Sequence, residues 1–290
     1  MRRINSAVGA PDRDFLAAEV PLEIRVEGRS VAVVMRTPGD DRELAAGFLV
    51  TEGLVRKAAD IADIRHVPHC LRAGVAGAQP SVLDAMEGNV IAVKLARPDK
   101  VDLSKLTRHV FTSSSCGVCS KASIDAVRQQ FPRVTGRCRV RPDVLLQLPA
   151  KLAAAQETFK RTGGLHACAL FDLGGKLLAL REDVGRHNAL DKIVGWALLE
   201  KLLPLRRQML LLSGRTSFEM VQKALAAGVP VVAAISAPSS LAVEFAQESG
   251  QTLVGFLRGE KMNVYAGEER IAIPRVARAN GLARKANLPG

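Results

Sequence analysis

The sequence predicts an α/β protein with a main domain built on a largely parallel sheet and a smaller α+β domain before it. Two observations lead to this prediction. In the second half, short β-rich runs alternate with helical stretches, which is typical of strands joined by helices that cover a sheet. The first hundred residues instead combine a hairpin pattern with one helix. We expect an N-terminal domain over 15–106, a main domain over 107–273 and a basic tail over 274–290.

The N-terminal part has a clear hairpin pattern. Residues 22–26 alternate apolar and charged side chains, and Glu27-Gly28-Arg29 supplies a turn before a second β-rich run. Asp40 and Asp41 then resemble a helix start, and Gly53 resembles a stop. The expected elements are strands at 22–26, 31–35 and 89–93, a helix from about 41 to 53, and a loop or weak element over 66–88.

The main domain shows the alternation most clearly after residue 166. Ligands of such sheets bind beyond the carboxyl ends of strands, where loops enter helices. The loops that follow the strands are therefore the first place to look for a site. The expected helices are 118–131, 148–161, 188–203, 218–227 and 241–247, and the expected strands are 167–171, 176–180, 209–212, 231–235 and 253–257.

Composition limits the possible functions. The formal charge of +12 fits nucleic acid, an acidic partner protein or a phosphate-bearing ligand, or it serves solubility alone. With one Trp, one Tyr and nine Phe, the chain has little to stack on bases, so we expect no nucleic-acid partner. No apolar run reaches the roughly 18 residues of a membrane span, so we expect no membrane partner.

The cysteines indicate a reducing compartment. Five cysteines are scattered over the chain, which is too few for a disulfide framework. The N-terminus lacks the apolar segment of a secretory signal. We therefore expect a cytoplasmic protein.

Cys116 and Cys119 form a CxxC pair where a Ser-rich loop runs into a predicted helix. A thiol at a helix N-terminus is stabilised as thiolate, and Lys121 adds positive charge, so Cys116 is a candidate nucleophile and sulfur acceptor. A redox dithiol, half of a zinc site, a sulfur carrier and a pair of structural cysteines all share this spacing.

His166 follows a Thr162-Gly163-Gly164 turn at the mouth of a predicted strand. It could donate to a phosphate or adjust a thiolate, or it could be a packed histidine. Cys168 lies two residues further in an apolar strand and is predicted to belong to the core.

Arg186 and His187 lie in the first turn of a predicted helix that Asp183 can cap. Positive charge there opposes the helix dipole, which makes sense if an anion rests at the helix start. A solvated first turn is the simpler alternative.

Two further strand-to-helix loops carry Arg215 and Ser239. Each offers hydroxyls and N–H groups at a helix start, although plain capping would also explain them. Neither loop has the spacing of a P-loop or of a dinucleotide-binding fingerprint.

Taken together, the motifs resemble the FdhD family, the sulfurtransferase accessory proteins of formate dehydrogenase. The similarity extends over roughly residues 20 to 275. The motifs are Glu43-Leu44-Ala45 with Gly47-Phe48-Leu49, Ser115-Cys116-Gly117-Val118-Cys119, Thr162-Gly163-Gly164-Leu165-His166, the run from Glu182 to Lys192, Ser213-Gly214-Arg215 with Ser217, Glu219 and Met220, Ser236-Ala237-Pro238-Ser239, and Gly255-Phe256 with Arg258. The family commonly has Gly where this chain has Ser120, a change that should leave the chemistry intact.

The resemblance implies a cytidine-deaminase-like three-layer main domain, a homodimer, and sulfur transfer from a cysteine desulfurase to a molybdenum cofactor destined for formate dehydrogenase. That cofactor is Mo-bis(molybdopterin guanine dinucleotide), a pterin that carries guanine nucleotides, and it is bound as a substrate, with no permanent metal expected. The persulfide falls on Cys116, with Cys119 as helper. Cofactor binding falls on the segment Phe256, Leu257, Arg258, Gly259, Glu260 and Lys261, and as a hypothesis also on His166, Arg186, His187, Arg215 and Ser239.

Two other functions remain open from sequence. A zinc hydrolase of the deaminase type also uses a CxxC, but it needs a His-x-Glu triplet upstream. The triplets that begin at His66, His69 and His109 all lack the Glu. A chaperone that binds the molybdenum cofactor without sulfur transfer would be separated from a carrier by replacing Cys116.

Overall fold

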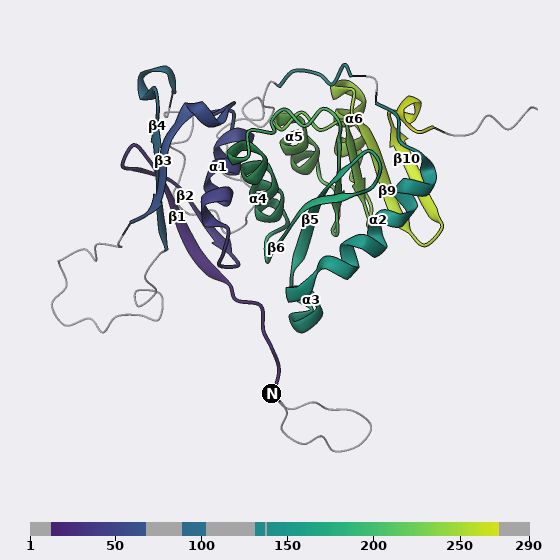
Figure 1. Cartoon of the computed structure of the whole chain (residues 1–290), viewed down its shortest axis with the longest axis horizontal. Helices are drawn as coiled ribbons and strands as arrows, with labels where there is room; N and C mark the ends of the chain where they lie inside the picture. Colours follow the sequence, from purple (N-terminus) through teal and green to yellow (C-terminus); the bar gives the residue numbers. More distant parts are fainter. Residues whose placement is uncertain (1–12, 68–88, 103–130, 137, 273–290) are drawn as a thin grey trace, which may run out of the picture.

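The computed structural model describes residues 13–67, 89–102, 131–136 and 138–272. Two β-sheets stand on either side of a central group of helices (Figure 1). The expected helix over 118–131 except its last residue, nearly all of the expected loop over 66–88, and the tail over 274–290 lie outside the described residues. Within the described part, no helix is long and apolar enough to cross a membrane.

The first sheet has four strands in the order β2-β1-β4-β3. The predicted hairpin is confirmed, because β1 and β2 pair antiparallel around Glu27 and Gly28, whose φ angles of 49° and 77° are those of a tight hairpin turn. The predicted strand near residue 90 is also confirmed and pairs parallel to β1. Strand β3 was not predicted from the sequence. The bounds are β1 (Val20–Val26), β2 (Arg29–Arg36), β3 (Ile61–His66) and β4 (Val90–Leu95).

Helix α1 (Asp41–Thr51) covers this sheet and ends where it was predicted to end. Gly53, with a φ of 79°, donates to the carbonyl of Val50 and closes the helix in a left-handed conformation that suits glycine. Short 3-10 turns, η1 (Ala58–Asp60), η2 (Pro98–Lys100) and η5 (Glu268–Arg270), complete the irregular parts.

The second sheet has six strands in the order β10-β9-β8-β7-β5-β6, and the prediction that it is largely parallel is wrong. Only the pairs β7–β8 and β8–β9 are parallel, whereas β5 pairs antiparallel with both β7 and β6, and β10 pairs antiparallel with β9. The tight turn between β5 and β6 forces the reversal, because two strands joined so closely can only run antiparallel. The bounds are β5 (His166–Asp172), β6 (Leu177–Asp183), β7 (Gln208–Leu212), β8 (Val231–Ala234), β9 (Thr252–Arg258) and β10 (Lys261–Ala266).

Helices lie on both faces of the six-stranded sheet. On one face the helices share a core cluster with Cys168, Leu170 and Leu210, and on the other face α2 packs against Ala169 and Leu211. This alternation along each strand is what a sheet covered on both faces requires. The helices are α4 (Arg186–Leu199), α5 (Phe218–Ala226) and α6 (Ser240–Ser249) on the first face, with α2 (Pro142–Ala155) on the second and the short α3 (Glu157–Thr162) after it.

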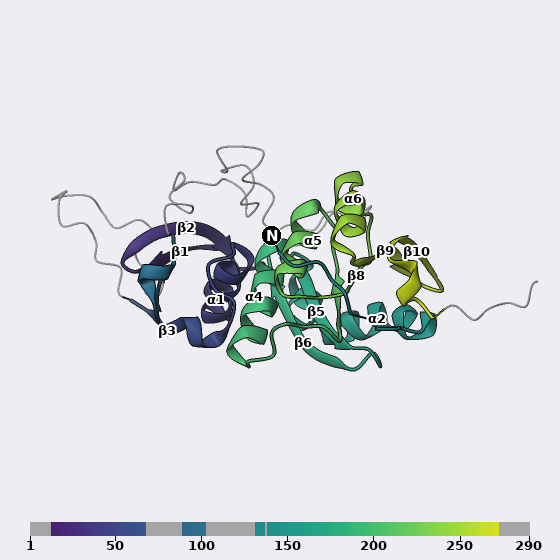
Figure 2. The same ribbon diagram turned by 90° about the horizontal axis from the view of Figure 1, so that it is seen from above.

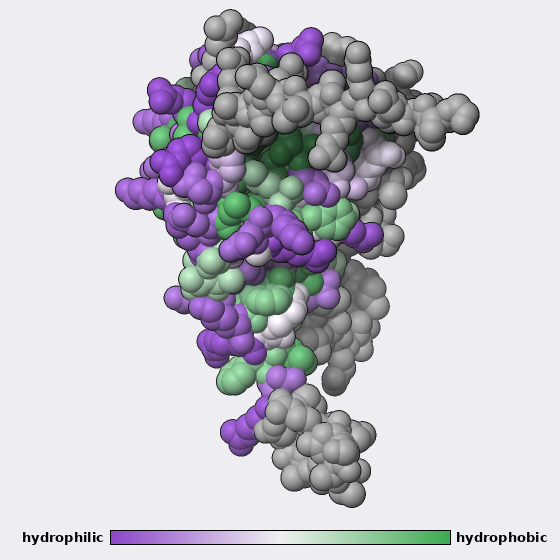
Figure 3. Space-filling model, turned by 90° about the vertical axis from the view of Figure 1, so that its right-hand side faces the viewer, coloured by the Kyte–Doolittle hydropathy of each residue, from purple (hydrophilic) through white to green (hydrophobic). Residues whose placement is uncertain are grey.

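Two details of the predicted elements are corrected. The helix expected over 148–161 begins six residues earlier, because Pro142 is favoured in the first turn, and it is interrupted at Gln156, so that α2 and α3 are separate. The edge strand β10 was not predicted as a strand. Its exposed Lys261 and Asn263 hinder edge-to-edge pairing, and hydrophilic and hydrophobic residues intermingle over this side of the molecule (Figure 3).

Helices α1 and α4 join the two sheets into one body. Figures 1 and 2 show the two helices side by side between the sheets. A Cβ on Gly47 would lie 1.8 Å from the carbonyl oxygen of Asp191, and a Cβ on Gly195 would lie 1.8 Å from that of Glu43. One core cluster continues from Leu22 of β1 through both helices to Leu210 of β7. The division at residue 106 remains a prediction.

Candidate functional site

Several predicted site residues meet at one edge of the six-stranded sheet. β7 and β8 end there at Leu212 and Ala234, which are paired. Because β5 runs in the opposite direction, its first residue, His166, lies at the same edge and pairs with Asp183, the last residue of β6. The sequence expectation that these loops share an edge is confirmed.

Gly214 allows three of these segments to approach one another. A Cβ at Gly214 would lie 3.2 Å from His166 Nδ1 and 4.0 Å from Arg186 Cδ. The absence of a side chain therefore leaves space in which the imidazole and the arginine stem lie against the loop. Arg215, the next residue, is exposed.

The surroundings of His166 favour its neutral form over its charged form. Partial burial lowers the pKa of His166, and the positive charges of Arg186, His187 and Arg215 lower it further, while Asp183 acts in the opposite direction. A neutral imidazole has one donor and one acceptor nitrogen, so it can take part in hydrogen bonding and proton exchange beside the guanidinium groups.

Three buried polar atoms at this edge have no hydrogen-bond partner among the described residues. Arg186 Nε, Thr216 Oγ1 and Ser217 Oγ make no hydrogen bond within the part of the chain that the structure describes, and Thr216 is only 1% exposed. Buried polar groups are normally satisfied, so this arrangement leaves donors available for an anionic or polar ligand. The two arginines supply the charge that phosphate oxygens favour.

Ser239 lies in the neighbouring loop, which is tied to the loop of Arg215. Thr216 N donates to Ala237 O at 3.1 Å, and Ser239 N donates to Thr216 O at 3.0 Å. The Ser239 hydroxyl accepts from Ala242 N at 3.3 Å and caps α6, so the capping alternative holds for its side chain.

The family assignment follows from comparison with known proteins. The sequence model of the FdhD/NarQ family matches residues 17–272. The chain belongs to the FdhD/NarQ family. The resemblance inferred from the motifs is thereby confirmed.

Curated relatives of this family cover nearly the whole chain, and all three named here carry the name "Sulfur carrier protein FdhD". The relative from Streptomyces coelicolor is 52% identical over 274 residues, 93% of this chain and 94% of its own. The one from Mycobacterium tuberculosis is 50% identical over 263 residues, 89% and 92% of the two chains. The one from Saccharolobus solfataricus is 41% identical over 272 residues, 93% and 95% of the two chains.

A solved structure also resembles this family member. It comes from Desulfotalea psychrophila and was provisionally identified as a formate dehydrogenase accessory protein. The two structures have a TM-score of 0.69 with 25% sequence identity, over 93% of this chain and 96% of the other.

The buried hydrogen bonds and ion pair around Asp183 were not predicted from the sequence. Asp183, predicted only as a helix cap, accepts from Gly185 N at 2.8 Å and Asn188 Nδ2 at 2.9 Å, and its second oxygen pairs with Lys192 Nζ at 2.8 Å. The same carboxylate accepts from Thr37 N at 3.1 Å, which ties the first sheet to the start of α4. Charged residues in the otherwise apolar α4 were the available signal.

His187 turns away from the edge. It is 2% exposed, and its Nε2 lies 2.8 Å from Glu219 Oε2 on α5. One turn further along both helices, Asp191 pairs with Lys223 at 2.7 Å and accepts from the Thr51 hydroxyl at 2.9 Å. Burial raises the pKa of Asp191, and Lys223 opposes that rise. His187 therefore supports the site from within the interface of α4 and α5.

The predicted cofactor segment forms the end of β9, a turn and the start of β10. Leu257 is fully buried in the second core cluster, whereas Arg258, Gly259, Glu260 and Lys261 are exposed. Phe256 has a φ of 51°, which is unusual for a residue with a side chain, and its N–H donates to Ser236 O at 3.1 Å. The Arg258 guanidinium lies 5.5 Å from the centre of its ring. The segment therefore adjoins the loop of Ser239.

The cysteines divide into two groups. Cys116 and Cys119 lie outside the described residues. Cys168 is fully buried, as predicted, and burial together with Asp191 raises the pKa of its thiol. Burial also raises the pKa of Cys138, against the opposing charge of Arg270. Within the described ranges, no cluster of three or more His, Cys, Asp or Glu could hold a metal.

Proposed function

We propose that this family member is a sulfur carrier that accepts sulfur as a persulfide on Cys116 and transfers it to a molybdenum cofactor before that cofactor enters formate dehydrogenase. The observation that carries the proposal is the edge where His166, Arg186 and Gly214 meet beside buried donors that have no partner among the described residues, in a chain whose relatives are named sulfur carriers. Such an edge suits a ligand that bears phosphate groups.

The first step is a thiolate attack. The Cys116 thiolate attacks the outer sulfur of a persulfide on a cysteine desulfurase, the S–S bond of the donor breaks, and the donor cysteine leaves as a thiolate. Cys116 then carries the sulfur as its own persulfide. The protein is an enzyme in the sense that it turns over as a sulfurtransferase, and it works in the reducing cytoplasm, where these thiols persist.

Release of the sulfur as sulfide needs two electrons. Attack of the Cys119 thiolate on the inner sulfur of the persulfide supplies them, forming a Cys116–Cys119 disulfide and releasing hydrosulfide. A cellular dithiol then reduces the disulfide. The hydrosulfide passes to the molybdenum cofactor, which is the substrate of the reaction.

The cofactor is Mo-bis(molybdopterin guanine dinucleotide), and the arginines would bind its phosphates. Arg186 and Arg215 provide charge, His166 provides a neutral imidazole, and the segment from Phe256 to Lys261 adjoins the Ser239 loop. Replacing Arg186 and Arg215 together by Met should weaken the binding of guanosine diphosphate, measured by calorimetry, at least about tenfold. Unchanged affinity would remove the arginines from the site.

The proposal also covers the oligomeric state of the protein and the arrangement of its helices and sheet in layers. We infer a homodimer and a cytidine-deaminase-like arrangement of helices on both faces of the six-stranded sheet. Helices on both faces are compatible with such layering, and analytical ultracentrifugation tests the dimer directly.

The decisive experiment is intact-mass measurement before and after incubation with a cysteine desulfurase and cysteine. Wild-type protein should gain one sulfur atom, and Cys116→Ala should gain none. If neither protein gains sulfur, the transfer mechanism fails, and a chaperone that binds the cofactor without sulfur chemistry becomes the better explanation. Stoichiometric zinc in the purified protein would instead favour a hydrolase.

A further inference from the structure

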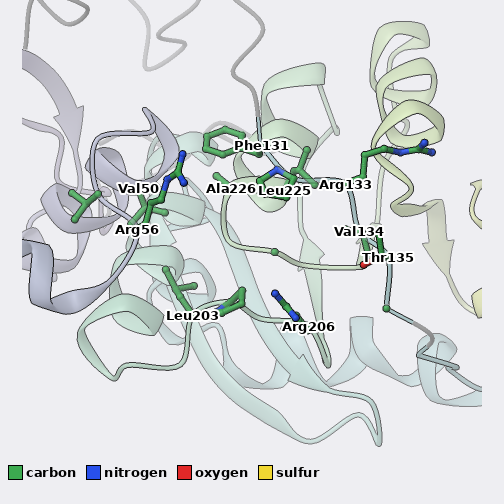
Figure 4. Close-up of a pocket in the computed structure, with 15 residues that line it drawn as sticks. Val50, Arg56, Phe131, Arg133, Val134, Thr135, Leu203, Arg206, Leu225 and Ala226 are labelled. Atoms are coloured by element: carbon green, nitrogen blue, oxygen red, sulfur yellow. The ribbon is translucent and has the colours of Figure 1, made fainter. Parts of the chain in front are cut away.

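Two hollows lie at the end of the sheet opposite His166. The larger, with a volume of about 560 Å³, is bordered by Pro204 and Arg206 before β7 and by Gly228 before β8, so it lies where these strands begin (Figure 4). The smaller, about 350 Å³, lies between η1 and the end of α4. Leu203 lines both hollows, and the two together are called the basic groove below.

The floor of the basic groove is apolar. Val50 in the last turn of α1, Val55 just after that helix and Leu225 of α5 contribute buried side chains to it. Leu202, at the same corner, is 46% exposed, which is high for a large aliphatic side chain. An apolar floor beside an exposed leucine is typical of a surface that receives side chains from another molecule.

Among the described residues, the charged side chains that line the basic groove are all positive. They are Arg56, Lys57, Arg133, Lys201 and Arg206, and no described Asp or Glu lines either hollow. Figure 4 shows Arg56 and Arg206 directed toward the hollow and Arg133 directed away. Within the described ranges, the guanidinium groups of Arg56 and Arg206 have no carboxylate partner. The nearby Asp60 is engaged by the backbone N–H groups of Arg56 and Lys57.

The shape and charge of the basic groove select its occupant. Two separate hollows that share Leu203 as a lining residue suit an extended peptide, which can place one side chain in each, better than one compact molecule. Arginines at the rim suit Asp and Glu on that peptide. The occupant is therefore an acidic protein segment with a bulky apolar side chain.

Chain continuity connects the basic groove with the sulfur chemistry. Phe131, which lines the larger hollow, is the first described residue after the stretch that contains Cys116 and Cys119. Val101, just before that stretch, and Phe131 both pack against the same core cluster. A donor bound in the basic groove would therefore contact Phe131, which follows that stretch in the chain.

We propose that the basic groove docks the sulfur donor through an acidic segment that inserts an apolar side chain beside Leu203. This inference rests on the proposed sulfur-carrier function and specifies the partner surface for its first step. Docking here is separate from the chemistry on Cys116, so a small persulfide donor should bypass the groove.

The test compares two sulfur donors. Initial rates of sulfur loading are measured with a cysteine desulfurase from the same organism plus L-cysteine, and separately with glutathione persulfide. The variants are Arg56→Glu with Arg206→Glu, and Leu203→Asp alone, with Arg56→Gln plus Arg206→Gln as a milder pair. The matched control is Arg207→Glu, because Arg207 is an exposed neighbour of Arg206 that lines neither hollow.

The charge-reversed pair should raise the KM for the desulfurase at least about tenfold, with kcat unchanged and loading from glutathione persulfide unchanged. Arg207→Glu should behave as wild type. Raising the salt from about 50 mM to about 300 mM should raise the wild-type KM more than that of the charge-reversed pair.

A KM within twofold of wild type for every groove variant would overturn the docking proposal. So would an altered sedimentation coefficient with unchanged loading kinetics, because the groove would then face a second copy of this chain. If wild-type protein accepts sulfur from both glutathione persulfide and the desulfurase, and the variants load sulfur with the same kinetics, only the docking proposal fails. If wild type accepts sulfur from neither donor, the sulfur-carrier function itself fails.

Discussion

Gly47 of α1 and Gly195 of α4 lie against each other at the contact between these two helices, which pack on different sheets. A Cβ on either glycine would approach the backbone nitrogen of the other to 2.8 Å or less. The helices therefore pack backbone to backbone, closer than any pair with larger side chains can approach. Arg186 of the candidate site is the first residue of α4. Its position therefore depends on how α4 packs against α1.

Replacing Gly195 by Ala should lower the free energy of unfolding by about 3 kcal/mol, because the helices must separate to admit the methyl group. In an open helix the same change would stabilise the protein. Urea denaturation gives the measurement. Gly136→Ala is the matched control, because a Cβ there would have nothing within 4 Å, and it should leave the midpoint unchanged.

Replacing Lys192 by Met should cost about 3 to 5 kcal/mol of stability, because the Asp183 carboxylate would remain buried without its cation. The double variant Asp183→Asn with Lys192→Met should lose less than the sum of the two single changes. A double-mutant cycle from chemical denaturation measures the coupling. Strictly additive losses would show that the two groups do not interact.

His166 should titrate below the ordinary histidine value of about 6.5, because burial and the neighbouring arginines disfavour its charged form. The unfolded chain then binds this proton more readily than the folded chain. The stability contribution of His166 is therefore fully present above the unfolded pKa and is lost as the pH falls toward the folded pKa. An NMR titration of the imidazole measures the shift, and Arg186→Met should move the pKa upward. A titration at or above 6.5 in the wild type would contradict the assignment.

Cys168 should resist alkylation in the folded protein at neutral pH. Full burial and the Asp191 charge raise the pKa of its thiol, and the thiolate is the form that reacts. Iodoacetamide labelling followed by peptide mass spectrometry should find Cys168 modified only in denaturant. Rapid labelling of Cys168 under native conditions would show that this part of the core opens.

The sequence predicted the parts of the site that depend on local pattern. Arg186, Arg215 and Ser239 each follow a β-rich run and precede a helical one, and such loops gather at one edge whenever the strands share a direction. The direction of β5 is not visible in local periodicity. His166 reaches the same edge only because β5 is reversed, which a parallel arrangement would not allow.

Contacts between residues far apart in the sequence could not be predicted from local sequence patterns. Gly47 looked like an ordinary small residue on the helix that carries Leu44 and Phe48, because nothing near it in sequence shows that Gly195 lies opposite. Asp183 was recognised as a cap, but its pairing with Lys192 and Thr37 depends on how α4 meets the first sheet. The edge strand β10 is half exposed, and its mixed polar and apolar residues resemble those of a loop.

The arm before β1 has a practical consequence for purification. The Arg161 guanidinium lies 4.8 Å from the centre of the Phe15 ring, and Ala17 meets the place where a side chain on Gly164 would lie. The chain therefore enters the fold beside the turn that leads into His166. The first described residues therefore lie near the edge where we propose that the cofactor binds, so an affinity tag at the amino end should compete with large ligands. The last described residue, Ala272, instead donates to the carbonyl of Val140 just before α2, so a tag at the carboxyl end is the better choice for binding measurements.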